Sequence, residues 1–300
     1  MWPRGAECER QVACCMSIER PSRATVLWQD NTLINSTTSS WLFPPQTCEL
    51  QFDEKWSFVG KKEKNCDPDN PADARQGDNW DHVAYDPEHR LVINVVPGKR
   101  SAANIEASVQ DAKKRLGGRV PNLIATDEFA AYPQAILNAW GDTVTPPRTG
   151  KPGRPKAPYQ VPSPDLKYAT VHKTRVKGRV VKVEPRVIFG TELAVKEALE
   201  KSQVSRSINT AFIERHNGTD RNRNGRKVRK TYCFSKDWDI HEAVTYFTMY
   251  IYNFCWGVRT LRQKNADGHW QDRTPAMAAG LTDHVWSIAE WLKSPTVQRE

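Results

Sequence analysis

Three acidic residues stand at positions that core packing does not explain, and their side chains are of a type that binds metal ions. Asp53 lies inside a segment rich in β-forming residues, where a carboxylate has poor strand propensity. Asp127 follows a short apolar run, and the carboxyl end of a buried strand is a common place for a ligand site. Glu214 follows Phe212 and Ile213 in an otherwise apolar helical turn. If these carboxylates converge, they can hold hard divalent cations such as Mg²⁺ or Mn²⁺.

Converging carboxylates repel one another, so keeping them all ionised in a partly desolvated site is costly. Two divalent cations about 3.5–4 Å apart remove that cost, activate an attacking oxygen and stabilise the leaving oxygen of a phosphoryl displacement. The nucleophile of such a displacement would be water or a hydroxyl group. The spacing alone leaves alternatives open. An isolated carboxylate more often lies on the surface, and the neighbouring Glu54 and Glu128 fit a ligand role equally well.

The segments around the first two carboxylates have the patterns of strands and helices. In chain order we expect strands over 50–60, 82–85 and 91–96, a helix over 101–116, a strand over 122–126 and a helix over 132–140. This order is that of an RNase H-like α/β domain, whose mixed sheet carries helices on its faces. Other α/β folds share the same order, so the pattern by itself does not decide between them.

The chain is expected to divide into three parts. Residues 1–48 show neither a helical period nor strand alternation and contain no CxxC pair, which predicts an atypical, poorly ordered leader. Residues 49–260 are expected to form the catalytic domain, with an insertion at about 142–205. Residues 261–300 predict a helical C-terminal tail.

Four patterns after residue 140 predict further elements. Basic residues mixed with Pro and Gly over 145–165 predict an extended loop, and valines alternating with Lys and Arg over 168–190 predict a hairpin with one basic face. Residues 192–201 predict a helix. A long helix starting near Asp237 or Asp239 has an apolar stripe that predicts core packing. The stripe consists of Ile240, Val244, Phe247, Ile251, Phe254 and Val258.

The positive charge of the chain is concentrated in one region. The net charge is +9 and the pI is about 9.2, but residues 145–230 hold 21 Lys and Arg against 7 Asp and Glu, a balance of +14. The remainder therefore carries −5, and the concentrated charge favours a polyanionic partner. The seven cysteines form no CxxC pair, and neither a signal peptide nor a membrane span is visible. We therefore expect a cytoplasmic protein that binds a polyanion.

Three motifs carry a resemblance to a known family. The segment from Gln51 to Gly60 (QFDEKWSFVG) closely resembles the motif around the first catalytic aspartate of transposases in the bacterial insertion-sequence-one family. Thr126-Asp127, followed by Tyr132, is similar to the second motif, and FIERHN over 212–217 is similar to the third. The resemblance covers roughly residues 50–140 and 205–255.

The resemblance implies a DDE transposase with an RNase H-like, integrase-type catalytic domain. It identifies Asp53, Asp127 and Glu214 as the catalytic triad and as the ligands of two Mg²⁺ or Mn²⁺ ions. It further implies DNA strand cleavage and strand transfer in transposition, with transposon ends and target DNA as partners and a homodimer on the DNA. The alternatives are a degenerate DNA-binding remnant of a transposase and a nuclease of the same fold that only cleaves.

Basic and amide side chains near the third carboxylate are the expected DNA contacts, since phosphate contacts supply most of the affinity for DNA. They are Arg215, Asn217, Arg221, Arg223, Arg226, Lys227, Arg229 and Lys230, with Arg148, Lys151, Arg154 and Lys156 of the insertion as weaker candidates.

Overall fold

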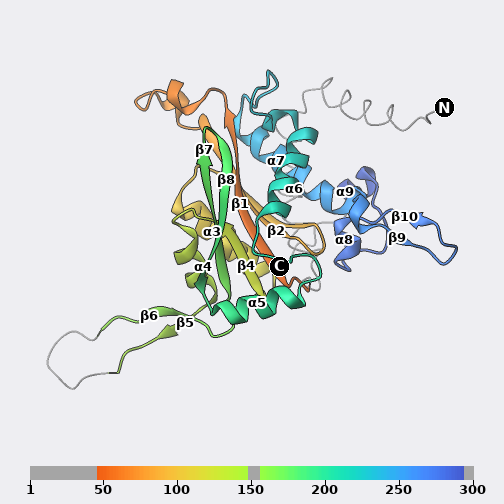
Figure 1. Cartoon of the computed structure of the whole chain (residues 1–300). Helices are drawn as coiled ribbons and strands as arrows, with labels where there is room; N and C mark the ends of the chain where they lie inside the picture. Colours follow the sequence, from red (N-terminus) through yellow and green to blue (C-terminus); the bar gives the residue numbers. More distant parts are fainter. Residues whose placement is uncertain (1–45, 148–155, 294–300) are drawn as a thin grey trace.

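A computed structural model describes residues 46–147 and 156–293, and its centre is a mixed sheet of six strands (Figure 1). The strands lie side by side in the order β3-β2-β1-β4-β7-β8. Their bounds are Glu49–Val59 for β1, Gly77–Asp86 for β2, Leu91–Gly98 for β3, Leu123–Asp127 for β4, Tyr168–Val176 for β7 and Arg179–Phe189 for β8.

The strand directions are those expected of an RNase H-like sheet. β1, β2 and β3 form an antiparallel meander, β4 and β7 run parallel to β1, and β8 returns antiparallel to β7. The helix α3 (Ala102–Arg115) provides the crossover that the parallel strand β4 requires, and α4 (Tyr132–Trp140) follows β4. The predicted order of three strands, a helix, a strand and a helix is therefore confirmed, as is the predicted mixed α/β sheet flanked by helices.

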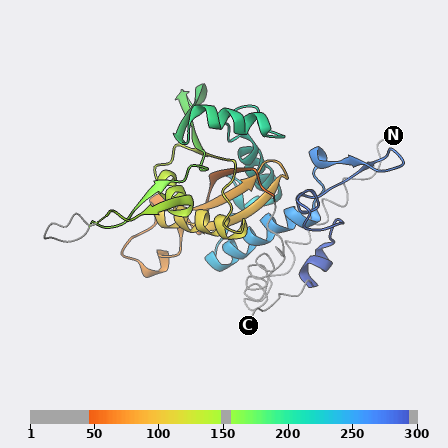
Figure 2. The same cartoon turned by 90° about the horizontal axis from the view of Figure 1, so that it is seen from below.

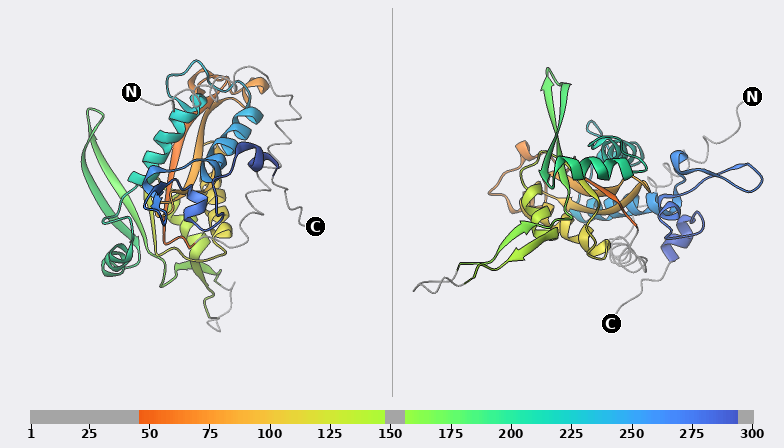
Figure 3. Two further views of the ribbon diagram at one scale, coloured as in Figure 1. Left: turned by 90° about the vertical axis from the view of Figure 1, so that its right-hand side faces the viewer. Right: turned by 60° about the horizontal axis from the view of Figure 1, so that its bottom comes forward.

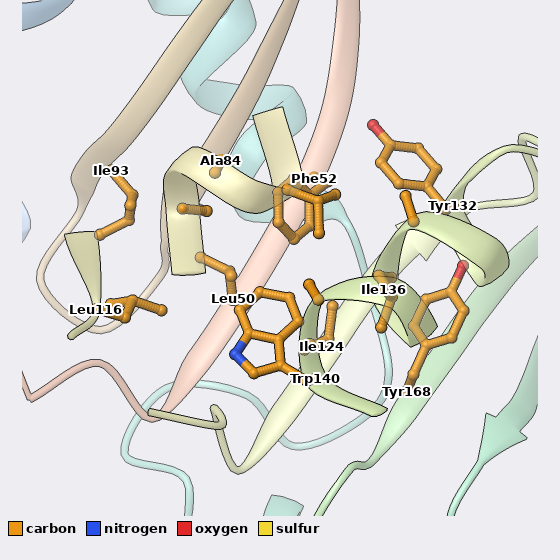
Figure 4. Packing of buried hydrophobic residues seen from close by; sticks show 14 of the residues in the cluster. Leu50, Phe52, Ala84, Ile93, Leu116, Ile124, Tyr132, Ile136, Trp140 and Tyr168 are labelled. Carbon is orange, nitrogen blue, oxygen red and sulfur yellow. The ribbon is translucent and has the colours of Figure 1, made fainter. Parts of the chain in front are cut away.

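The first face of the sheet is covered by α3 and α4. Leu50 and Phe52 of β1 have no exposed surface and lie in one buried cluster with Ile105 of α3 and Ile136 of α4. Figure 4 shows Leu50, Phe52 and Ile136 within this cluster. Full burial of a Leu or Phe side chain stabilises a fold by about 1.5–3 kcal/mol. Burial of Leu50 and Phe52 therefore determines which face of β1 lies against the helices. Successive strand residues point to opposite faces, so the odd-numbered residues of β1, including Asp53, point away from this core.

The second face of the sheet is covered by α6 (Ala211–Arg223) and α7 (Trp238–Cys255). α7 begins after Asp237, whose side chain accepts a hydrogen bond from the backbone N–H of Ile240. Ile213 of α6 is buried in the same cluster as residues of β2, β3 and α7. The predicted apolar stripe of the long helix is confirmed at Ile251 and Phe254, which are buried in that cluster.

The segment expected as an insertion contributes two strands to the main sheet. β7 pairs with β4 and β8 pairs with β7, so residues 168–189 form the hairpin that the sequence predicts. The prediction of one basic face is wrong, because β7 and β8 carry basic side chains on both faces. α5 (Glu192–Lys201) matches the predicted helix. β5 and β6, at Gly141–Val144 and Tyr159–Pro162, form a separate ribbon that projects from the body (Figure 1).

Short elements follow α7, on the side of the molecule away from the β5–β6 ribbon (Figure 2). They are β9 (Gln263–Lys264), β10 (Trp270–Gln271), α8 (Pro275–Ala278) and α9 (Ile288–Lys293). Ala276 and Trp291 from this segment are buried against α7. Across residues 46–147 and 156–293, every helix is too short or too polar to cross a membrane. Nearly all of the leader expected at 1–48 lies outside the described residues.

Candidate active site

Three carboxylates converge where β1 runs past the carboxyl end of β4. One oxygen from each of Asp53, Glu54 and Asp127 lies within 4.8 Å of the others. The parallel pairing of β1 with β4 explains this convergence, because Phe52 is opposite Thr126 and the next residue on each strand is an aspartate. The structure thus brings together two of the three carboxylates that the sequence selects, together with Glu54.

Asp53 and Glu54 point to opposite faces of β1 and have different partners. Asp53 Oδ2 accepts a hydrogen bond at 2.8 Å from the Asn217 side chain of α6. Glu54 Oε2 instead accepts one at 2.8 Å from Arg100, which precedes α3, and the Glu54 side chain is 2% exposed. Arg100 also lies 3.8 Å from Asp127 Oδ2. Asp53 is therefore the residue of this pair that faces the helix carrying the third motif.

The electrostatics of the cluster oppose full ionisation. Burial raises the pKa of Asp53 to about 7, and the nearby carboxylates of Asp127, Glu54 and Glu214 contribute in that order. Burial, followed by the charge of Glu54, also raises the pKa of Asp127. A group of oxygen donors that repel one another in this way fits a hard divalent cation, which replaces repulsion with attraction.

Glu214 lies on α6 but outside the cluster of three carboxylates. Its Oε1 accepts a hydrogen bond from Thr210 Oγ1 at 2.7 Å and forms an ion pair with Lys173 of β7. The carboxylate is close enough to Asp53 to raise the pKa of that group. Glu128, the alternative ligand beside Asp127, forms a hydrogen bond with His172 and an ion pair with Arg186, and it is not part of the cluster.

A network of buried charges underlies the site and links β1, β2 and α6. Lys55, on the same face of β1 as Asp53, is fully buried and forms ion pairs with Asp81 of β2 and Asp220 of α6. Lys227, also buried, lies 2.8 Å from Asp81 Oδ1 and donates to Nε2 of His241 at 2.8 Å. That donation requires a neutral imidazole, and burial followed by the charge of Lys227 lowers the pKa of His241 to about 3.

This buried network was not predicted from the sequence. One signal was available, because Lys55 lies two residues after Asp53 in the predicted strand and therefore on the same face. A lysine at such a position requires acidic partners, since a buried unpaired ammonium group is very costly. Its partners Asp81 and Asp220 are distant in sequence, and the pattern of residues around them gives no sign of the pairing.

The expected DNA contacts differ in exposure. Arg215, Arg223, Arg229, Lys230 and Lys156 are exposed, and Arg221 and Arg226 are half-buried. Two members of the set are buried and already bonded: Asn217 donates to Asp53, and Lys227 is paired with Asp81. The remaining candidates, Arg148, Lys151 and Arg154, lie outside the described residues.

Arg221 lies near the carboxylate cluster. Burial, followed by the charge of Arg229, lowers the pKa of Arg221, whereas the charge of Asp53 acts in the opposite direction. Its Nε is buried without a hydrogen-bond partner among the described residues. Arg221 thus places a cation at the boundary between the carboxylate cluster and the basic surface of α6.

Comparisons with known proteins give a partial match. No family model and no curated protein matches the chain. Among solved structures, a "Mos1 transposase paired-end complex with left transposon end" is 18% identical, covers 41% of each chain and has a TM-score of 0.21. The "Mos1 Strand Transfer Complex" is 20% identical over 40% of each chain, with a TM-score of 0.21. A "Mos1 mariner paired end complex with Mn" is 17% identical over 40% of this chain and 41% of that chain, with a TM-score of 0.21.

The chain therefore matches about two fifths of the length of these transposases. The structural correspondence is weak, so the function of this chain has to be inferred from its own site.

Proposed function

We propose that this chain is a transposase that cleaves and joins DNA strands with the help of divalent metal ions. The observation that carries the proposal is the convergence of Asp53, Glu54 and Asp127. Glu214 lies on α6, the helix that covers the face of the sheet to which Asp53 points. The motifs around these residues resemble those of insertion-sequence-one transposases, and the proposal extends that resemblance to the activity.

Asp53 and Asp127 are the proposed metal ligands, and Glu214 is the third once Lys173 releases it. The donors are all carboxylate oxygens, which suit Mg²⁺ or Mn²⁺. When bound, two such ions would activate the attacking oxygen and stabilise the leaving oxygen of a phosphoryl displacement. Asn217 orients the Asp53 carboxylate through its hydrogen bond, so its role is positioning.

DNA is the proposed substrate because Arg221 lies beside the carboxylate cluster and further cations follow on α6 and in the next segment. The exposed and half-buried members of the set are the proposed phosphate contacts: Arg215, Arg221, Arg223, Arg226, Arg229 and Lys230. Lys227 and Asn217 are left out of this group because both are buried and bonded within the protein.

The proposal is tested by strand transfer with the purified chain and labelled DNA that carries the ends of its element. With Mg²⁺ or Mn²⁺ present, we expect cleaved and joined products that disappear in Asp53→Ala and Asp127→Asn. Asp69→Asn, at an exposed aspartate remote from the cluster, is the matched control and should retain activity. Cleavage without joining would indicate a nuclease, and DNA binding without either reaction would indicate a DNA-binding remnant.

A further inference from the structure

The β7–β8 hairpin extends well beyond the sheet to which it belongs. β7 pairs with β4 only over Tyr168–Val171, and the last of these residues is opposite Asp127. From His172 to Arg179 and back along β8, the two strands pair only with each other, and the hairpin stands clear of the body (Figure 3). We call residues 172–184 the distal ribbon. It starts at His172, the residue after Val171, which is paired with Asp127 of the carboxylate cluster.

The turn at the end of the distal ribbon is well defined. Lys177 and Gly178 are its two central residues, and both have positive φ values, of 49° and 78°. Two consecutive residues with positive φ are typical of the tight turns that match the twist of a two-stranded ribbon. The turn therefore keeps the two strands paired up to the tip, across one register shift between Thr174 and Arg175.

The tip of the distal ribbon is strongly cationic. Arg175, Lys177 and Arg179 are exposed, and none of them forms an ion pair with any residue in the described ranges. The other cations of the ribbon are paired, because Lys173 binds Glu214 and Lys182 lies 2.8 Å from Glu184. Three neighbouring cations without acidic partners attract a polyanion and repel another basic surface.

Apolar side chains lie among these cations. Val176, Val180, Val181 and Val183 are 53%, 44%, 59% and 53% exposed, although valines on a sheet surface are usually covered. Residues paired across a ribbon share a face, so Val180 lies beside Arg175 and Val183 lies beside Lys173. This face continues at its base into the contact between Lys173 and Glu214.

We propose that the distal ribbon binds duplex DNA and holds it beside the carboxylate cluster. A two-stranded β-ribbon fits the major groove of B-DNA, where cations reach phosphates and apolar groups contact the thymine methyl. A second copy of this chain is the less favoured occupant, because ribbon-to-ribbon contact would bring six unpaired cations together. The inference rests on the proposed function, since it assigns a DNA contact surface to that same site.

The test removes three charges at the tip, with Arg175→Gln, Lys177→Gln and Arg179→Gln combined. The matched control removes three exposed charges in and after α5, with Lys196→Gln, Lys201→Gln and Arg206→Gln. We expect the ribbon variant to bind duplex DNA at least tenfold more weakly at 150 mM salt. Its plot of log affinity against log salt should be shallower by about 0.9 for each lost phosphate contact. The control should stay within twofold of the parent protein.

Unchanged affinity and salt slope in the ribbon variant would overturn the proposal. It would also be overturned if the variant changed only the association of protein copies, measured by sedimentation, while DNA binding persisted. Thermal unfolding of both variants checks that they fold. The ribbon proposal and the transposase proposal fail under different results. If the parent protein binds DNA through the ribbon but neither cleaves nor joins it, the ribbon proposal holds and the transposase proposal is rejected. If cleavage is lost in Asp53→Asn but DNA binding does not depend on the ribbon, the transposase proposal holds and the ribbon proposal is rejected.

Discussion

Lys173 of β7 and Glu214 of α6 form an ion pair that ties the third candidate carboxylate to the base of the distal ribbon. The Lys173 side chain is 21% exposed and that of Glu214 is 48% exposed, so the pair is only partly screened by water. The ammonium group and Thr210 Oγ1 both donate to the same oxygen, Glu214 Oε1. A metal ion that recruits Glu214 must therefore compete with Lys173.

Replacing Lys173 with Met should increase the affinity for Mg²⁺ or Mn²⁺. An ion pair of this exposure contributes about 0–1 kcal/mol, so removing the competitor should tighten metal binding by up to about fivefold. Titration calorimetry with Mn²⁺ measures the change. Lys182→Met removes a comparable pair with Glu184, away from the carboxylate cluster, and should leave metal affinity unchanged. Weaker metal binding in Lys173→Met would mean that Lys173 supports the site instead of competing for it.

Metal affinity should depend on pH through Asp53. Burial, together with the neighbouring carboxylates, raises the pKa of Asp53 to about 7, and this proton must leave before a metal ion binds. Below pH 7 the affinity should therefore fall by about tenfold per pH unit, and above pH 7 this dependence should disappear. Dissociation constants for Mg²⁺ at pH 6, 7 and 8 measure the effect. An affinity that stays constant between pH 6 and 7 would contradict it, and Asp53→Asn should remove most of the binding.

The same raised pKa affects the stability of the metal-free protein. The unfolded chain releases this proton near pH 4, whereas the folded protein keeps it until about pH 7, so the fold loses stability as the pH rises between these values. Bound metal should offset this loss, since it stabilises the ionised carboxylate.

The strand pattern predicts how Asp53 and Asp127 meet, but it does not predict the final ligand set. The alternation of apolar residues in β1 and the short apolar run before Asp127 are local sequence patterns. Both predict strands correctly, because the same apolar residues pack in the core. The choice between Asp53 and Glu54 depends on which face α6 covers, which is a tertiary relationship. For the same reason, net charge predicts Lys227 as a DNA contact, whereas the structure buries it against Asp81.

The start of β2 is another feature that the local sequence pattern does not predict. The predicted strand begins at His82, and the observed strand begins at Gly77. The additional residues include Asn79 and Asp81, which have poor strand propensity but face the buried network. Their partners Lys55, Lys227 and His241 come from distant segments, so local propensity gives the wrong boundary.

Lys227 and its exposed neighbours Arg229 and Lys230 should behave differently when their charges are removed. Lys227→Met leaves the buried Asp81 with one cation fewer, and breaking a buried pair typically costs about 3–5 kcal/mol. We expect a loss of this order in the free energy of unfolding, measured in urea. For the fraction of Lys227→Met that folds, the salt slope of DNA binding should be unchanged. Arg229→Gln with Lys230→Gln should show the opposite, with unchanged stability and a shallower slope. If Lys227→Met flattened the slope without destabilising the fold, the buried assignment would be wrong.

The buried histidine His216 should make the protein less stable in acid. Its ring centroid lies 4.9 Å from that of Tyr85 in a stacked arrangement and 4.7 Å from that of Tyr252 in a tilted one. Burial lowers the pKa of His216 to about 3. As the pH falls below about 6.5, the unfolded chain binds a proton that the folded protein does not accept until about pH 3. His216 should therefore remove on the order of 1 kcal/mol of stability per pH unit in this range.

His216→Phe keeps an aromatic ring between the two tyrosines and removes the titrating group. Urea unfolding at pH 7.5, 6.5 and 5.5 should show a smaller loss of stability on acidification than in the parent protein. Part of the loss should remain, because His241, with a pKa lowered to about 3, acts in the same direction. His269→Gln, at an exposed histidine, is the control and should retain the parent pH dependence. Equal pH slopes for His216→Phe and the parent would show that His216 takes up its proton without unfolding.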